Sequence, residues 1–302
     1  MCRGRLAGHM DLAVDVTPSG IEWFRERGET PAIVSVSDVH GYLEAARNAL
    51  TAVGDTDAFP PLVTSDDDGR LHWAGNDYVL VINGDLIDRG DRNRECLALV
   101  ERLAAEAPHG RVRYHLGNHE MAALFPDRFR WPGVYSVEMD DDVRRSFLEH
   151  VADGRIAVGF DGYEYAYSHA GANDPFDTEA VNGRARDAGR RLVEMWRDGR
   201  YETNHLDVLP EYQRIFGVGG GFGRGPSAGL LWMDFKHMEP DAPPQVVGHS
   251  RQQRPTRTGN VVCENVIRDN LGVPGGEAVL IERPDGIVAV TKTSDGATVT
   301  EV

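Results

Sequence analysis

The first half of the chain alternates short apolar runs with amphipathic stretches. Runs rich in β-branched residues predict buried strands, and apolar residues at helical spacing predict helices that bury one face. The strands are expected over residues 32–37, 77–83 and 111–116, and the helices over residues 41–53, 92–107 and 140–151. Strands that alternate with helices are typical of a sheet with parallel strands covered by helices.

The second half of the chain predicts hairpins and further short strands. Turn sequences rich in Asp, Gly and Pro, such as Asp161-Gly162 and Pro284-Asp285-Gly286, separate neighbouring β-branched or aromatic runs. The strands are expected over residues 155–160, 163–168, 245–247, 260–263, 278–282 and 286–291. The predicted fold class is therefore α/β with mixed sheets.

A single domain is expected over residues 10–302, with residues 1–9 as an N-terminal extension or cloning scar. Residues 172–228 change character, because a charged helix is expected over residues 178–197 and residues 216–229 are rich in glycine. The glycine-rich stretch lacks the GK[ST] ending of a P-loop, so we expect a mobile loop and not a phosphate cradle. Residues 172–228 are predicted to be a helical and glycine-rich insertion within the domain.

Composition argues against several classes of protein. No run approaches the roughly 18 apolar residues of a membrane span, and the N-terminal stretch has no apolar core of a secretory signal. Cys2, Cys96 and Cys263 are too widely spaced to predict a disulfide framework, and a reducing cytoplasm is expected. The net charge is −16, with lysine only at Lys236 and Lys292, which disfavours binding to nucleic acid and to membranes. The oligomeric state is not indicated.

Five polar motifs carry the candidate chemistry, and most of the first four directly follow an apolar run. They are SDVHG at 37–41, GDLIDRG at 84–90, GNHE at 117–120, SHAG at 168–171 and GHS at 248–250. Ligands gather at the carboxyl ends of strands in open α/β sheets, so these distant side chains can converge. The six candidate metal ligands are Asp38, His40, Asp85, Asn118, His169 and His249.

This donor set predicts two divalent cations. Imidazole, carboxylate and amide oxygen together suit Mn, Fe, Zn or Co better than Ca, and Mn is predicted first. Asp38 and His40 leave their strand on the same side and can bind one cation, while Asp85 has two carboxylate oxygens and can bridge two. Two cations about 3.5–4 Å apart clamp the attacking and leaving oxygens of a phosphoryl transfer and make hydroxide available near neutral pH.

Three neighbouring residues are the candidate catalytic groups. Arg89 has a planar cationic guanidinium suited to two phosphate oxygens, so Arg89 is predicted to bind substrate. Asn118 is also predicted to bind substrate. His119 follows Asn118 and is expected to protonate a leaving oxygen from beside the metals. Asp88 is placed to orient His119 through its other ring nitrogen.

In this order the motifs resemble those of the calcineurin-like metallophosphoesterases. More narrowly, they resemble the phosphoprotein phosphatase family of serine/threonine phosphatases and its bacterial and archaeal members. The resemblance covers residues 33–291 and implies a β-sandwich of two mixed sheets flanked by helices. It implies one metal on Asp38, His40 and Asp85, and a second metal on Asp85, Asn118, His169 and His249.

The resemblance also implies supporting residues and leaves some positions open. LLWMD at 230–234 resembles the family's LLWxD segment, which implies that Asp234 supports the site from a loop. The family's second phosphate-binding arginine has no evident counterpart, and Arg224 and Arg251 are the two candidates. Ala170 departs from the family's His-Gly-Gly motif, and His-Ala-Gly also occurs in diadenosine tetraphosphate hydrolases, which typically lack an acid at the position of Asp88.

The function implied is that of a metal-dependent phosphomonoesterase. Hydroxide bridging the metals attacks phosphorus, Arg89 holds the phosphoryl oxygens and His119 protonates the leaving oxygen. Phosphoserine or phosphothreonine in proteins is the first expected substrate, with phosphotyrosine or a small phosphoester also open. Hydrolysis of dinucleoside polyphosphates is the alternative. A non-catalytic phospho-binding scaffold is a third interpretation, disfavoured because all six ligand positions are filled.

The acidic surface and the scarcity of lysine together predict a halophilic protein. In a halophilic cytoplasm, surface carboxylates keep a protein solvated in concentrated salt. We expect the melting temperature and the refolding yield to rise from dilute buffer to molar KCl, as followed by circular dichroism. Full stability and activity without added salt would contradict this prediction.

Overall fold

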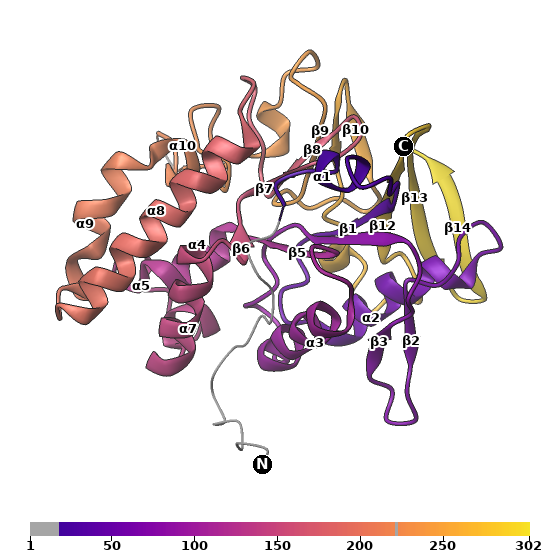
Figure 1. The fold of residues 1–302 in the computed structure, drawn as a ribbon, viewed down its shortest axis with the longest axis horizontal. Coiled ribbons are helices and arrows are strands. Elements are labelled where there is room, and N and C mark those ends of the chain that lie inside the picture. Colours follow the sequence, from indigo (N-terminus) through magenta and orange to yellow (C-terminus); the bar gives the residue numbers. More distant parts are fainter. Residues whose placement is uncertain (1–17, 221–222) are drawn as a thin grey trace.

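The computed structural model describes residues 18–220 and 223–302, and Figure 1 shows its arrangement. The predicted N-terminal extension and Cys2 lie outside the described residues. Cys96 and Cys263 are free and buried, as expected of small core residues. None of the helices in the described ranges combines the length and the apolar character that a bilayer crossing requires.

The larger of two facing β-sheets has seven strands in the order β14-β13-β12-β1-β4-β5-β6. Strands β1, β4, β5 and β6 run parallel, and β12, β13 and β14 are antiparallel to their neighbours. Their bounds are β1 (Ala32–Val36), β4 (Tyr78–Ile82), β5 (Val112–His115), β6 (Ile156–Ala157), β12 (Ala278–Arg283), β13 (Gly286–Thr293) and β14 (Gly296–Glu301).

The smaller sheet has five strands in the order β10-β11-β9-β8-β7, and a separate hairpin pairs β2 with β3. Both sheets are flanked by helices, so the prediction of an α/β fold with mixed sheets is confirmed. The bounds are β7 (Gly159–Asp161), β8 (Ala166–Ser168), β9 (Gln245–Val247), β10 (Thr256–Thr258), β11 (Val261–Cys263), β2 (Val63–Ser65) and β3 (Leu71–Trp73).

Side-chain alternation along the strands builds two hydrophobic layers. Val79 and Val81 of β4 pack between the sheets with residues such as Phe160 and Val246 of the smaller sheet. Leu80 points to the opposite face and packs with the helices. Each such side chain is fully buried and stabilises the fold by about 1.5–3 kcal/mol relative to exposure.

The four helices predicted from spacing are present as α2 (Leu43–Ala52), α3 (Asn93–Glu106), α7 (Asp141–Ala152) and α8 (Thr178–Arg197). Helix α2 contacts β12 and β13, α3 contacts β5, and α7 packs against α8 beside β6 (Figure 1). The pattern missed shorter helices of four to seven residues: α1 (Glu22–Arg25), α4 (Asn118–Leu124), α5 (Pro126–Phe129), α6 (Tyr135–Glu138), α9 (Asn204–Val208) and α10 (Gln213–Phe216).

One predicted strand is two strands in different sheets. Residues 155–160 form β6 of the larger sheet and β7 of the smaller sheet, and the chain changes sheet at Val158. The amides of Val158 and Gly159 donate to Asn182 Oδ1 of α8 at 2.9 and 3.1 Å. The Asn182 side chain, 23–24 residues away, therefore takes the place of a neighbouring strand as hydrogen-bond acceptor. The alternation of polar and apolar residues within 155–160 cannot indicate such a distant partner.

The parallel strands bring the polar motifs to one edge of both sheets. Motifs at 37–41, 84–90 and 117–120 follow β1, β4 and β5, which run side by side. His169 and His249 follow β8 and β9, which are parallel neighbours in the smaller sheet. Asn83 joins the two edges, because its side-chain amide donates to the carbonyls of Ser168 and Val246, at 3.2 Å each.

Glu282 of β12 forms a second polar bridge between the sheets. Its buried carboxylate accepts hydrogen bonds from the amides of Glu164 and Tyr165, at 2.6 and 3.1 Å, and from the Tyr167 hydroxyl at 2.8 Å. Removal of the Glu282 carboxylate would leave these two amides and the Tyr167 hydroxyl without their hydrogen-bond acceptor.

We expect Glu282→Ala to lower the free energy of unfolding by about 3–5 kcal/mol, because a buried charged partner is lost. Urea denaturation followed by far-UV circular dichroism measures the change. Glu301→Ala, on the exposed end of β14, is the control and should change stability by less than about 0.5 kcal/mol. A similar small effect of both substitutions would contradict the role of Glu282.

Candidate functional site

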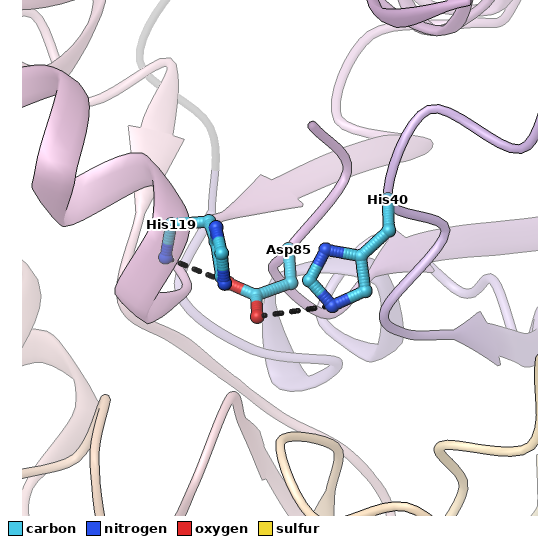
Figure 2. Close-up of side chains that lie close together, drawn as sticks. All are labelled: His40, Asp85 and His119. Atoms are coloured by element: carbon cyan, nitrogen blue, oxygen red, sulfur yellow. Dashed lines mark hydrogen bonds and ion pairs between the residues drawn. The ribbon is translucent and has the colours of Figure 1, made fainter. Parts of the chain in front are cut away.

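The six side chains singled out as ligands lie together at the shared edge of the sheets. His40 Nε2 lies 3.7 Å from Asp38 Oδ1 and 3.5 Å from Asp85 Oδ2. Asp85 Oδ2 is also 3.5 Å from His169 Nε2. Figure 2 shows the Asp85 carboxylate between the His40 ring and the backbone of His119, whose amide donates to Asp85 Oδ1 at 2.9 Å. Asp85 thus belongs to two groups of candidate metal ligands, one that contains His40 and one that contains His169.

Asn118 completes the second group. Its Oδ1 lies 3.3 Å from His169 Nε2 and 2.8 Å from His249 Nδ1. All three residues are buried. Asp85, His169 and His249 have ligand atoms within 4.8 Å of one another, a spacing suited to one cation.

The backbone around these side chains is strained. Eight described residues other than glycine have positive φ, and seven of them belong to or border the candidate site. Such left-handed conformations cost about 1 kcal/mol or more each and cluster at functional sites. The seven are Asp38, His40, Asp85, Asp88, Arg89, Arg224 and His249.

Two of the histidines are fixed in one tautomer by backbone carbonyls. His40 Nδ1 donates to the carbonyl of Ile87 at 3.1 Å, and His169 Nδ1 donates to that of Asn83 at 3.0 Å. Burial lowers the pKa of both imidazoles, which favours the neutral form. Each Nε2 therefore presents a lone pair to the carboxylates, as a metal ligand does.

The carboxylates of Asp38 and Asp85 also have the properties of metal ligands. Burial raises the pKa of Asp38 to about 7 and raises that of Asp85 as well. Asp38 Oδ1 has no hydrogen-bond partner within the described residues, although it is buried. Buried anionic oxygens facing nitrogen lone pairs are unfavourable unless a cation lies between them. The residues present therefore fit divalent metal ions.

His119 also lies within 4.8 Å of His40 and Asp85, and Asp38 is not in that group. Both ring nitrogens of His119 already have partners, however. Nδ1 lies 2.5 Å from Asp88 Oδ2, and Nε2 lies 3.3 Å from an Arg89 nitrogen. Asp38, with its unpartnered oxygen, is therefore the better ligand candidate.

The His119–Asp88 pair is fixed by its surroundings. Asp88 is fully buried and accepts hydrogen bonds from the amide and hydroxyl of Ser136, both at 2.7 Å. Burial alone would lower the pKa of His119, but the carboxylates of Asp85 and Asp88 outweigh it and raise that pKa. Arg89 is exposed, so its guanidinium is accessible beside the pair.

Contacts distinguish the two candidates for a second arginine. Arg224 Nε donates to His249 Nε2 at 3.0 Å, and Arg224 Nη2 pairs with Asp234 Oδ1 at 2.9 Å. Arg251 instead pairs with Asp269 and is half exposed. Arg224 and Asp234 therefore border the site, whereas the partner of Arg251 within residues 18–220 and 223–302 is Asp269, which is not a ligand candidate.

Sequence reasoning gave no role to Glu120, although GNHE was singled out. Its carboxylate accepts from the amides of Asp85, Leu86 and Gly117, at 2.8, 2.9 and 2.8 Å. Tyr114 donates a fourth bond at 2.8 Å. The acid three residues into a helix start is a capping signal, which could have indicated part of this role.

Sequence reasoning also missed Trp131, which lies beside His119. The two rings are 5.1 Å apart and tilted by 46°. Phe129 lies 4.8 Å from Trp131 and stacks on Trp232 at 5.6 Å. Nothing in the sequence around Trp131 signals this position, because the residue lies in an irregular loop between α5 and α6.

The sequence profile of a protein family described as calcineurin-like phosphoesterase matches residues 31–250. Over 139 residues the chain is 31% identical to Shewanella-like protein phosphatase 2 of Arabidopsis thaliana, covering 42% of this chain and 32% of that protein. Over 121 residues it is 26% identical to a symmetrical bis(5'-nucleosyl)-tetraphosphatase of Histophilus somni, covering 37% of this chain and 41% of that protein. Both matches thus span less than half of the relative.

Solved structures share the fold. A cold-active protein-tyrosine phosphatase of a psychrophilic Shewanella species superimposes with a TM-score of 0.58 and 18% identity, covering 95% of this chain and 82% of that chain. A further structure of a cold-active protein tyrosine phosphatase gives a TM-score of 0.61 and 17% identity, covering 95% and 81%. At this identity the similarity concerns the fold alone.

We expect the Asp85→Asn variant to bind much less metal than the unmodified protein, because an amide replaces the carboxylate that faces both His40 and His169. Metal content after dialysis against Mn²⁺ and then buffer is measured by mass spectrometry, with exposed Asp57→Asn as the control. Mn²⁺ should raise the melting temperature of the unmodified protein and of the control only. Unchanged metal content in Asp85→Asn would remove Asp85 as the shared ligand.

Proposed function

The chain belongs to the calcineurin-like phosphoesterase family and is a hydrolase, and from that premise we propose that it is a phosphomonoesterase acting on phosphorylated protein side chains at a dinuclear metal site. The match to a protein phosphatase of Arabidopsis thaliana supports this choice and the narrower phosphoprotein phosphatase assignment. We also propose Mn²⁺ as the working metal, on the mixed carboxylate, amide and imidazole donors. The buried free cysteines are consistent with work in a reducing cytoplasm.

The buried His119–Asp88 pair is the observation that carries the proposal. An alkoxide or phenoxide leaves poorly without a proton, so hydrolysis of an alcohol ester benefits from a positioned acid. The 2.5 Å contact between His119 Nδ1 and Asp88 Oδ2 keeps Nδ1 occupied, so Nε2 is the nitrogen that carries a proton toward substrate once the Arg89 guanidinium, 3.3 Å away, turns to the phosphoryl oxygens. A nucleoside polyphosphate leaves as a weakly basic phosphate anion and has less need of such an acid.

Each residue has a separate task in this proposal. Two divalent cations, when bound, lower the pKa of a water molecule and withdraw charge from the phosphoryl oxygens. Arg89, beside His119, and Arg224, beside His249, bind those oxygens, and Asn118 contributes its amide. The water oxygen bonds to phosphorus as the ester P–O bond breaks, and His119 gives its proton to the departing oxygen. Inorganic phosphate and an alcohol result.

Asp234 is proposed as a positioning residue. If His249 held a cation through Nδ1, the ring proton would lie on Nε2, which could not then accept from Arg224. Asp234 Oδ1, at 3.8 Å from Nε2, is the nearby acceptor for that proton. Arg224 is then released from His249 and available to substrate, while its ion pair with Asp234 retains it at the border.

The space beside Arg89 suits a large substrate. A cavity of about 560 Å³ begins at Arg89, and charged side chains supply much of its lining. This open, polar shape suits a phosphorylated segment of a protein better than a small apolar molecule. The lining includes Arg89, Arg94, Gly133, Tyr135, Glu138 and Asp140.

Hydrolysis of dinucleoside polyphosphates is the second candidate function. The partial match to a tetraphosphatase of Histophilus somni favours it, as does Ala170 in the SHAG motif. The first assay therefore gives metal-stripped protein in high KCl, with and without Mn²⁺, three substrates in parallel. They are p-nitrophenyl phosphate, a phosphoserine peptide and diadenosine tetraphosphate.

Mn²⁺-dependent release of phosphate from the monoesters supports the proposal, whereas turnover of diadenosine tetraphosphate alone would replace it with the second candidate. Silence on all three substrates from folded, metal-loaded protein would favour a phospho-binding scaffold.

We expect His119→Ala to lower kcat on the phosphoserine peptide by about 10²–10⁴-fold, the usual contribution of a general acid. The loss on p-nitrophenyl phosphate should be smaller, because nitrophenolate leaves without a proton. Metal content should stay near that of the unmodified protein. Equal losses on both substrates, or loss of both metals, would contradict the assignment of His119 as the acid.

A further inference from the structure

Trp131 occupies the leaving-group side of the candidate site. Its ring centre lies 5.1 Å from that of His119, the residue from which the departing oxygen takes its proton in the proposed function. The side chain is partly exposed, so one part of the indole remains accessible. A group bonded to an oxygen that takes the proton of His119 would therefore lie near this indole.

Two other aromatic rings lie against the indole of Trp131. Phe129 lies 4.8 Å from Trp131, and Trp232 lies 6.4 Å from it. Phe129 and Trp232 stack nearly parallel, with an angle of 16° between the rings. The indole nitrogen of Trp232 donates to Met121 Sδ at 3.0 Å, which fixes the cluster on helix α4. The Trp131 side chain is thus held in place by neighbouring rings, although it lies in a loop.

We propose that Trp131 is a specificity-determining residue that selects substrates whose leaving group is an aromatic ring, as in phosphotyrosine. This inference rests on the proposed function, because His119 must face the departing oxygen. In a phosphotyrosine the ring is bonded directly to that oxygen. The P–O bond breaks, the water oxygen bonds to phosphorus, and the ring oxygen takes the His119 proton, so that tyrosine and inorganic phosphate are formed.

The geometry favours aryl over alkyl leaving groups for a physical reason. Aromatic rings attract one another in tilted or offset arrangements with centres about 4.5–7 Å apart, beyond the effect of area alone. The methylene of phosphoserine offers no ring to Trp131. In a nucleotide a sugar separates the base from the phosphate, so the base cannot lie where the departing oxygen meets His119.

The test compares Trp131→Leu, which keeps apolar bulk, with Trp131→Phe, which keeps a ring. Trp23→Leu, a partly exposed tryptophan packed on Arg27, is the matched control. Each variant, loaded with Mn²⁺, hydrolyses phosphotyrosine and phosphoserine peptides of identical flanking sequence. Trp131→Leu should lower kcat/KM on the phosphotyrosine peptide by about three- to tenfold, mainly through KM, because one aromatic contact is lost.

The same substitution should leave kcat/KM on the phosphoserine peptide within about twofold, and Trp131→Phe and Trp23→Leu should resemble the unmodified protein on both peptides. Equal losses on both peptides would assign Trp131 a structural role, and unchanged phosphotyrosine kinetics would assign it none. Either result overturns the inference.

A binding measurement separates this inference from the proposed function. Calorimetry gives the dissociation constants of phenylphosphonate and propylphosphonate, neither of which is hydrolysed, for the Mn²⁺-loaded protein. The unmodified protein should bind the phenyl compound more tightly, and Trp131→Leu should lose that preference. If no peptide is hydrolysed but the preference is present, the aromatic platform stands and the phosphatase proposal fails. No preference in the unmodified protein overturns the platform itself.

Discussion

One buried carboxylate, that of Glu120, joins the loops on which the site is built. It accepts amide hydrogen bonds from Asp85, Leu86 and Gly117, and so connects the chain after β4 to the chain after β5. Hydrogen bonds to a charged acceptor are each stronger than neutral ones. Burial raises the pKa of Glu120 to about 6, while the hydrogen bonds from Tyr114 and the Asp85 amide lower it and favour the ionised acceptor. The spacing between Asp85 and Asn118 follows from this connection.

The same loops carry conformational strain that the hydrogen bonds must offset. Asp85 has a φ of 53°, and its backbone amide donates to Glu120. Asp38 has an equal φ of 53°, and its Oδ2 accepts the amide of His249 at 2.9 Å. The backbone amides of Asp38 and Asp85 both have acceptors, in the Gly84 carbonyl and the Glu120 carboxylate, and these hydrogen bonds offset part of the cost of the left-handed conformations. The hydrogen bonds of these loops therefore stabilise both the strained backbone and the buried carboxylates at the strand ends.

Sequence alone brought together the six candidate ligands because each belongs to a motif at a strand end, and the parallel strands place such ends together. It also gave the long helices, whose apolar spacing is local information. It could not give the change of sheet at Val158, because a distant Asn182 satisfies the amides there. It could not choose Arg224 over Arg251, or find Trp131, because irregular loops place these side chains. The edge strand β14 escaped prediction because its outer residues are mostly exposed and lack clear alternation.

The division of the ligand candidates between two sheets has a consequence for how the chain folds. Asp38, His40, Asp85 and Asn118 follow strands of the larger sheet, whereas His169 and His249 follow strands of the smaller one. The bond between His249 and Asp38 joins residues 211 positions apart in the chain. Contacts of such long range form late and slowly. A nascent chain with only its larger sheet assembled offers four of the six candidate ligands, so a site built from all six is complete only after the two sheets have docked.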